Sequence, residues 1–347
     1  MKATAFNRHL QDFFEVYLPK VKGFSNNTVI SYQDSFRLLF EYFENQRHIK
    51  PYLLDYRHFS GEGIEVFLRW LESERNYCPS SRNQRLAAIS SFFKYASRKN
   101  MDALAICSQI LDVPAKKAPH KLISYFSLEE MQVLLQMPNL RKQLERRDLV
   151  LLSLLYDSGA RAQELCDLTV SDVRFGKPTM LHLLGKNNKA RVVPILDKPA
   201  NLVRQYLREN SLTGNESKSK PLFSSQTHKK ITPSCIRNLV KKYVAKAKSA
   251  RPDLFRAPSY SPHSFRHSKA VHMLEAGVHL IYIRDFLGHS TIQTTEIYAQ
   301  ISQSLVTKTL LARSIPQVEP IDHLPKEPPS TLPDFLLRKP GKAQNIM

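Results

Sequence analysis

The stretch DLVLLSLLYDSGARAQELCDL, residues 148–168, decides the fold of the second half of this sequence. From Asp148 to Tyr156 nearly every residue is apolar, which predicts a helix segment that is buried on all sides. Gly159 follows this helix, and Arg161 then stands at the start of the next helix. Glu164, one turn further on, can pair with the arginine or with a nearby backbone group. Taken alone, an arginine after a glycine turn is more often part of a structural ion pair than of a catalytic site.

The residues that follow mix short strands with helices. Thr179–Leu184 and Arg191–Leu196 are β-like runs, and residues 185–189 between them are predicted to form a hairpin because asparagine tolerates left-handed turn geometry. Helices are predicted over 232–248 and 263–276, the second closed by a glycine. The sequence therefore predicts a mainly α fold with a small antiparallel β-sheet in its second domain, a mixed α+β domain.

The first 112 residues are predicted to form a separate helical domain, with short amphipathic helices over 25–46, 63–74 and 79–98. A proline-containing basic stretch then predicts a linker over 113–125. Ser127 and Glu130 have the spacing of a capping box, which indicates that a new domain begins there. We expect the domains to be 1–112, 126–312 and a proline-rich, disordered tail over 313–347.

The charge balance indicates the kind of partner. Lysine and arginine outnumber aspartate and glutamate by 51 to 31, which gives a formal net charge of +20. Such an excess favours nucleic acid, because each phosphate neutralised by a basic side chain releases counterions. No run approaches the ~20 apolar residues of a membrane-spanning helix, and the N-terminus does not have the pattern of a secretory signal. The four cysteines form no CxxC pair, so the default compartment is a reducing cytoplasm.

Several basic or polar residues are candidates for contact with the DNA backbone. Arg82 and Arg85 lie near the N-terminal end of the helix over 79–98, where the helix dipole already favours anions. A solvent-exposed helix face without a ligand is an equally good explanation for these two arginines. The other candidates lie in the linker, in the hairpin and at the start of the basic helix: Lys116, Lys117, Lys121, Lys189 and Thr232.

Further motifs carry residues suited to phosphate chemistry. The i, i+3 spacing in PHSFRH, residues 262–267, places His263 and Arg266 on one helical face. The other candidates are a lysine at the hairpin tip, the histidine of an LGH motif and a tyrosine nine residues beyond it: Lys186, His289 and Tyr298. Each has a common structural explanation when taken alone, such as an exposed turn lysine or a packed tyrosine.

A zinc site is the alternative for the two histidines of the PHSFRH motif. His263 and His267 have the i, i+4 spacing of a zinc pair, but Ser264 stands where the HExxH motif has glutamate. Arg266 also lies between them, and a cation beside a zinc ion is unfavourable. The sequence therefore indicates no metal site and no cofactor.

The ordered set of these residues, in its sequence context, resembles the tyrosine recombinase (phage integrase-like) family. The resemblance rests on SGARxxEL, GKNNKARVVPI, HSFRH, LGH and the tyrosine beyond it, and it is strongest from about Phe126 to Ala312. One departure is the SKAV stretch at 268–271, which affects local packing and leaves the catalytic positions intact. The resemblance implies a helical core-binding domain and a catalytic domain that close around double-stranded DNA, and a tetramer on DNA, with partner recombinases where the system needs them.

The resemblance also assigns a role to each site residue. Two arginines and a histidine would hold the phosphate oxygens, and a tyrosine ester would conserve the bond energy for rejoining, so neither metal nor ATP is required. Because the reference pKa of tyrosine is about 10, the nucleophile needs a proton acceptor, and His263 is the expected one. The full expected set is Arg161, Lys186 as general acid, His263, Arg266, His289 and Tyr298 as nucleophile, with Glu164 in support.

Three alternatives remain at this point. The chain could be a type IB topoisomerase-like or resolvase-like enzyme, which oligomer state on DNA would distinguish. It could be a catalytically silent DNA-binding regulator with the same fold, although a complete catalytic set argues against this. It could also be a metal-dependent nuclease, for which chelation by EDTA would abolish cleavage.

Overall fold

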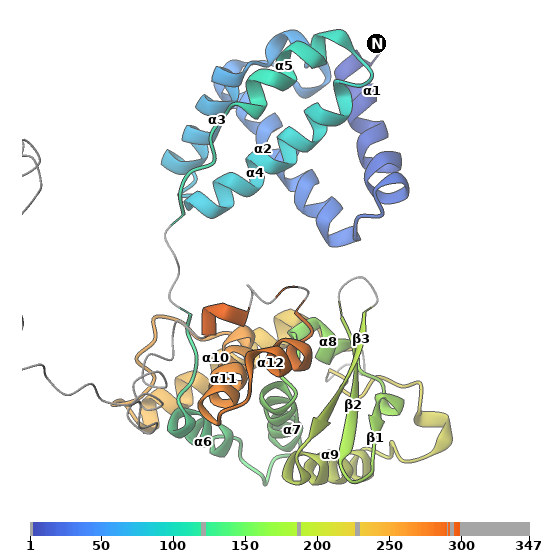
Figure 1. Cartoon of the computed structure of the whole chain (residues 1–347), viewed down its shortest axis with the longest axis vertical. Helices are drawn as coiled ribbons and strands as arrows, with labels where there is room; N and C mark the ends of the chain where they lie inside the picture. Colours follow the sequence, from blue (N-terminus) through green and yellow to red (C-terminus); the bar gives the residue numbers. More distant parts are fainter. Residues whose placement is uncertain are drawn as a thin grey trace, which may run out of the picture. The chain divides into compact units, whose positions relative to one another are not determined.

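A computed structural model describes residues 3–118, 123–185, 189–225, 230–289, 291 and 295–298. The chain divides into two compact units, and the boundary between them lies between Ser124 and Tyr125. The first unit is helical, and the second combines helices with a small sheet (Figure 1). The mainly helical fold with a small antiparallel sheet, expected from the sequence, is confirmed. Among the described residues, no helix is long and apolar enough to cross a membrane.

The first unit contains more helix than the sequence predicted. Its helices are α1 (Ala5–Asp12), a π-helical continuation (Phe13–Val21), α2 (Asn26–Arg47), α3 (Gly61–Ser73), α4 (Pro79–Ala96) and α5 (Met101–Leu111), with single 3₁₀ turns at Pro51–Leu53 and Tyr56–His58. The predicted helices correspond to α2, α3 and α4, whereas α1 and α5 were not predicted. The side chain of Ser25 accepts a hydrogen bond from the backbone of Thr28 and so caps α2.

An aromatic cluster holds these helices together. Phe92 of α4 packs edge-on against Phe6, Phe13 and Phe36, at ring-centroid distances of 5.2, 5.5 and 5.4 Å. These three rings come from α1, its π-helical continuation and α2, and all four side chains are buried. Edge-to-face contacts add to the stabilisation that comes from burying each ring.

The second unit is built around one buried helix. Its helices are α6 (Leu128–Gln136), α7 (Gln143–Asp157), α8 (Ala162–Asp167), α9 (Asp197–Glu209), α10 (Pro233–Ala250), α11 (Pro262–Glu275) and α12 (Leu280–Leu287). The buried segment predicted from Asp148 to Tyr156 forms most of α7, and six consecutive residues, 150–155, are buried. Because apolar side chains surround the helix, α6, α9 and α11 all pack against α7.

A three-stranded sheet lies at one side of this unit (Figure 1). Its strands are β1 (Val173–Arg174), β2 (Thr179–Leu184) and β3 (Ala190–Ile195), in the order β1-β2-β3. The predicted hairpin strands correspond to β2 and β3, and β1 pairs antiparallel with β2 in the register Val173 opposite Leu181. Side chains alternate between buried and partly exposed along β2, as a sheet with one covered face requires.

The capping signals in the sequence are confirmed. Ser127 and Glu130 form a reciprocal capping box at the start of α6, with hydrogen bonds of 3.1 and 2.8 Å. Thr232 caps α10, and Gly277 has a φ of +86° just beyond α11.

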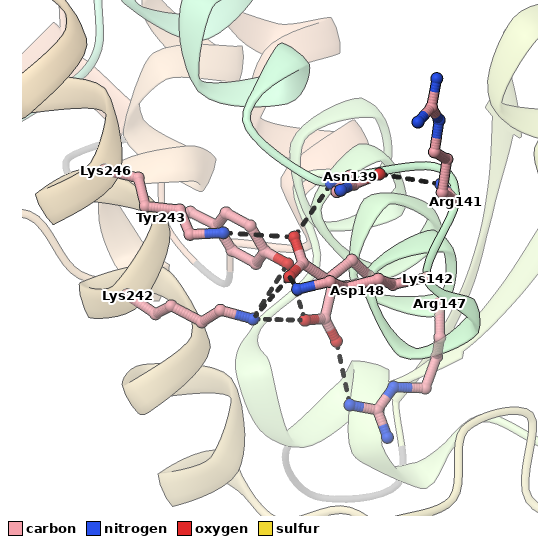
Figure 2. A network of polar contacts seen from close by, with 9 residues as sticks. Asn139, Arg141, Lys142, Arg147, Asp148, Lys242, Tyr243 and Lys246 are labelled. Atoms are coloured by element: carbon pink, nitrogen blue, oxygen red, sulfur yellow. Dashed lines mark hydrogen bonds and ion pairs between the residues drawn. The ribbon is translucent and has the colours of Figure 1, made fainter.

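Two buried carboxylates fasten α10 to α7. Figure 2 shows Lys242, Tyr243 and Lys246 of α10 directed at acidic side chains of α7. Tyr243 donates a 2.9 Å hydrogen bond to Asp148, and Lys246 lies 3.2 Å from Glu145. A backbone hydrogen bond from Asn139, aided by nearby lysines, lowers the pKa of Glu145 to about 2. Glu145 therefore stays ionised at neutral pH, and the network holds the two helices together.

Ser268, the first residue of the SKAV departure, has a definite packing role. Its buried hydroxyl accepts a 2.7 Å hydrogen bond from the backbone N–H of Phe126 and donates one of 2.7 Å to the carbonyl of Ser264. The start of the second unit is thereby bonded to α11, the helix that carries the histidine–arginine motif.

Candidate active site

Arg161 occupies the N-cap position of α8, after a turn that requires glycine. Gly159 has a φ of +57°, and a Cβ atom there would lie 2.9 Å from the side chain of Leu287. The left-handed backbone disfavours any larger residue here, and an added Cβ would also require Leu287 to shift. The guanidinium of Arg161 donates to Glu164 at 2.7 Å and is still partly open to solvent. The chain thus presents Arg161 at the surface of the unit, with one side of its guanidinium held by a carboxylate.

Glu164 is the centre of a buried ion cluster. Its carboxylate, which is 4% exposed, accepts two hydrogen bonds from Arg191, at 2.9 and 2.8 Å, in addition to those from Arg161. Burial alone would raise the pKa of Glu164, but hydrogen bonds and charges from the two arginines lower it to about 2. Glu164 therefore stays ionised and fixes both guanidinium groups.

Arg191 is a site residue that the sequence reasoning missed. Its side chain bonds to Glu164 and also donates from Nε to the backbone carbonyl of Phe286, at 3.1 Å. Gly288 has a φ of +67°, and a Cβ atom there would lie 2.9 Å from Cδ of Arg191. Arg191 therefore connects the arginine of α8 with the LGH loop after α12.

Arg266 lies on α11 and is 3% exposed. Its two terminal nitrogens donate to backbone carbonyls, that of Gly159 at 2.7 Å and that of Leu287 at 2.6 Å. Burial and then the neighbouring arginines Arg161 and Arg191 lower the pKa of Arg266 to about 9, which still leaves it charged at neutral pH. A buried cation with other cations nearby is suited to an anionic ligand.

His289 and Tyr298 lie beside this arginine cluster. His289 follows the left-handed cap of α12, and its Nδ1 lies 2.9 Å from the hydroxyl of Thr295. Its ring is nearly parallel to that of Tyr298, with centroids 6.5 Å apart. Burial, followed by Arg266 and Arg161, lowers the pKa of His289 to about 4, so the ring is neutral at physiological pH.

Tyr298 is 1% exposed, and its hydroxyl lies 2.9 Å from Nδ1 of His267. Burial raises the pKa of Tyr298, while the charges of Arg266 and Arg161 act in the opposite direction. His263 was expected from the sequence to accept the proton of this hydroxyl, whereas in the structure His267 is its hydrogen-bond partner. His267 was considered in the sequence only as a possible zinc ligand.

His263 lies one turn before His267 on α11, with the two ring centroids 6.3 Å apart. It presents part of its ring to solvent, but desolvation of the rest and the charges of Arg266 and Arg161 lower its pKa. Among the described residues, no group of three or more histidine, cysteine or acidic side chains could hold a metal ion. Lys186, the expected general acid, lies outside the described residues.

Two of the candidate DNA contacts form hydrogen bonds within the first unit. Arg82 is 5% exposed and donates to the carbonyl of Pro114 at 2.8 Å, which argues against contact with a ligand. Arg85 donates to the carbonyl and hydroxyl groups of Ser31 and Ser35, each at 3.1 Å. Both arginines tie α4 to neighbouring segments of the first unit.

The remaining candidates are mostly at the surface. Lys116 is exposed and pairs with Glu72 at 2.7 Å, while its backbone exchanges two hydrogen bonds with the side chain of Asn83. The exposed residues Lys117, Lys189 and Thr232 remain candidates, and Lys121 lies outside the described residues.

Comparison with known proteins identifies the family of this chain. The model of the phage integrase family matches residues 125–304, and that of the phage integrase N-terminal SAM-like domain matches residues 10–100. The tyrosine recombinase XerD of Vibrio cholerae is 31% identical over 81% of this chain and 88% of its own length. XerC of Myxococcus xanthus is 32% identical over 84% of this chain and 93% of its own.

A solved structure has the same fold at lower sequence identity. The XerH site-specific recombinase, in a post-cleavage complex with its palindromic difH substrate, is similar with a TM-score of 0.66 and 19% identity. The similarity covers 81% of this chain and 78% of that one. The fold and the arginine–histidine–tyrosine cluster define an enzyme that acts on phosphodiesters. The chain belongs to the phage integrase family, and it is a site-specific tyrosine recombinase that cleaves and rejoins DNA.

Proposed function

We propose that Tyr298 is the nucleophile and that cleavage of double-stranded DNA leaves a 3′-phosphotyrosyl intermediate. The observation that carries this proposal is the place of the Tyr298 hydroxyl, which lies against His267 and beside Arg266, Arg161 and His289. A phosphodiester carries one negative charge and gains more in the transition state, so cations fixed in advance lower the barrier.

The site residues then take separate roles. Arg161 and Arg266 bind the non-bridging oxygens of the scissile phosphate, Arg161 from the open side of the site and Arg266 from its buried floor. His263 and His289 donate further hydrogen bonds to the same oxygens. Lys186 protonates the 5′-oxygen as it leaves, which a deoxyribose alkoxide requires. Glu164 supports Arg161 and does not contact the substrate.

Access to Tyr298 is a second element of the proposal. At 1% exposure the ring is covered, so the phosphodiester cannot reach the hydroxyl until the site opens. We infer that DNA binding makes this opening, which limits cleavage to the assembled complex.

The biological setting follows from the same proposal. Strand exchange between two sites needs four active sites, so the working form is a tetramer on DNA, with partner recombinases in place of some copies where the system requires them. The substrate would be the ends of a mobile element that integrates, excises or transposes, and the enzyme would act in the cytoplasm.

A trapping experiment tests the nucleophile. DNA that flanks the protein's own gene is cut into duplexes with a nick next to the cleavage position, so that the short 5′ product diffuses away and the covalent complex accumulates. Wild type and Tyr298→Phe are run on a denaturing gel, with EDTA present throughout. A protein–DNA band for wild type alone supports the proposal and excludes a metal-dependent nuclease.

The opposite outcomes are equally clear. A band that persists in Tyr298→Phe means that another residue is the nucleophile. DNA binding by wild type without a band on any fragment favours the DNA-binding regulator.

A further inference from the structure

The hydrogen bond between Tyr298 and His267 bears on the proton that the nucleophile must lose. A tyrosine hydroxyl attacks phosphorus well only when a base removes its proton. A base must lie within about 2.6–3.2 Å of the atom that it deprotonates. The 2.9 Å distance from the hydroxyl to Nδ1 of His267 satisfies this condition. His263, the residue expected from the sequence, forms no hydrogen bond with Tyr298 among the described residues.

We propose that His267 is the general base of the cleavage step, and that His263 is not. This inference rests on the proposed role of Tyr298 as nucleophile. The phenolic oxygen forms a bond to the scissile phosphorus, and the bond from phosphorus to the 5′-oxygen breaks. The phenolic proton passes to Nδ1 of His267, and the 5′-oxygen takes a proton from Lys186. Rejoining reverses each of these transfers, so His267 then returns the proton to Tyr298.

The surroundings of His267 fit this role. Burial, then His263 and Arg266, lower the pKa of His267 to about 4, so the ring is neutral at neutral pH. In the tautomer that carries its proton on Nε2, Nδ1 can accept the hydrogen bond and then the proton of Tyr298. Bound phosphodiester places negative charge beside the ring, which favours the protonated form and strengthens the base when it is needed. The base would therefore act only when the substrate is present.

The position of His267 on α11 also suits a base that must not move. It directly follows Arg266, whose two bonds to backbone carbonyls fix that turn of the helix. The next residue, Ser268, bonds to the backbone of Phe126. His267 is thus held between two anchored neighbours, and the residue that binds the phosphate and the residue that takes the proton share one rigid element.

The structure supplies a matched control for the proposal. His272, five residues further along α11, contacts the hydroxyl of Tyr156 through its own Nδ1 at the same 2.9 Å distance. Among the described residues, that pair forms no hydrogen bond or ion pair with the arginine cluster. Replacement of His272 therefore removes a histidine–tyrosine bond from the same helix without changing the proposed chemistry.

The test measures single-turnover cleavage of the nicked duplex by His267→Asn, His263→Asn and His272→Asn. Asparagine can place an amide oxygen near the position of Nδ1, where it accepts a hydrogen bond but not a proton. We expect His267→Asn to lose about 100-fold to 10,000-fold in rate, the usual contribution of a general base. We expect His263→Asn to lose less than His267→Asn, and His272→Asn to cleave like wild type. DNA binding and thermal unfolding of each variant report whether it is folded.

A second substrate separates the base from the general acid. In a duplex with a 5′-bridging phosphorothiolate, the leaving thiolate needs no proton, so a Lys186→Ala variant should recover its rate while His267→Asn stays slow. Wild-type rates for folded His267→Asn, recovery of His267→Asn on this substrate, or an equal loss in His263→Asn each overturn the assignment. Covalent product from Tyr298→Phe would instead refute the proposed nucleophile itself.

Discussion

Removal of the charge on Glu164 should destabilise the second unit by an amount that depends on pH. The pKa of this carboxyl is lowered from 4.5 to about 2, and each pKa unit corresponds to about 1.4 kcal/mol, so its ionised form contributes about 3 kcal/mol of stability at neutral pH. Because the folded-state pKa is depressed, this contribution is complete well above pH 4.5 and is lost as the pH falls toward 2. Between pH 7 and pH 3 about 2 kcal/mol of it should disappear.

The assay is urea denaturation of wild type and Glu164→Gln at pH 7 and at pH 3, followed by circular dichroism. The glutamine keeps the shape of the side chain but leaves two arginines facing a neutral group, so a loss of about 3–5 kcal/mol is expected at pH 7. The difference between the two proteins should shrink by about 2 kcal/mol at pH 3. Glu129→Gln, which removes an exposed ion pair with Arg251, is the control and should cost less than about 1 kcal/mol.

One outcome would refute this reasoning. If the difference in unfolding free energy between wild type and Glu164→Gln is the same at both pH values, the arginines do not lower the pKa of the Glu164 carboxyl. In that case the ion cluster is not what holds Arg161 in place. A cleavage assay at pH 7 then shows whether Arg161 still acts, since a displaced guanidinium should slow cleavage without weakening DNA binding in proportion.

Three further predictions concern neighbouring features. Gly288→Ala should lower stability by about 1–2 kcal/mol in thermal unfolding, because the left-handed backbone disfavours alanine. It should also slow cleavage in the trapping assay, because the new methyl group would displace Arg191. Ser268→Ala should cost about 1–3 kcal/mol in urea denaturation by leaving the backbone N–H of Phe126 without its partner, and an unchanged midpoint would contradict this. The affinity for DNA should fall steeply with salt in filter binding, whereas affinity independent of salt would mean that phosphate contacts are few.

The helices and strands with strong periodic patterns could be predicted from the sequence. The apolar run of α7, the capping box of α6 and the alternation of β2 depend on local patterns, and local patterns fix local structure. Helix α9 was missed although its buried residues, Ala200, Val203, Tyr206 and Leu207, have helical spacing, because charged residues stand between them. The strand β1 has only two residues and carries no pattern that could be recognised.

The site shows where local patterns stop being informative. Arg191 matters because it lies opposite Glu164, and this pairing between residues 27 positions apart arises only once β3 and α8 pack together. The choice between His263 and His267 depends on which face of α11 packs against Tyr298. That contact joins residues far apart in the sequence, so no local pattern predicts it. Arg82, by contrast, was predictable: it lies four residues before Leu86, on the same buried stripe of α4.

The two bonds from Arg266 to the carbonyls of Gly159 and Leu287 have a consequence for engineering. Both acceptors belong to the main chain, so substitutions that alter only side chains around the cluster leave them in place. Arg266 binds backbone carbonyls, and any sequence that adopts this fold places those carbonyls in the same positions. Target preference can therefore be redesigned on the exposed surface while the chemical centre is inherited unchanged.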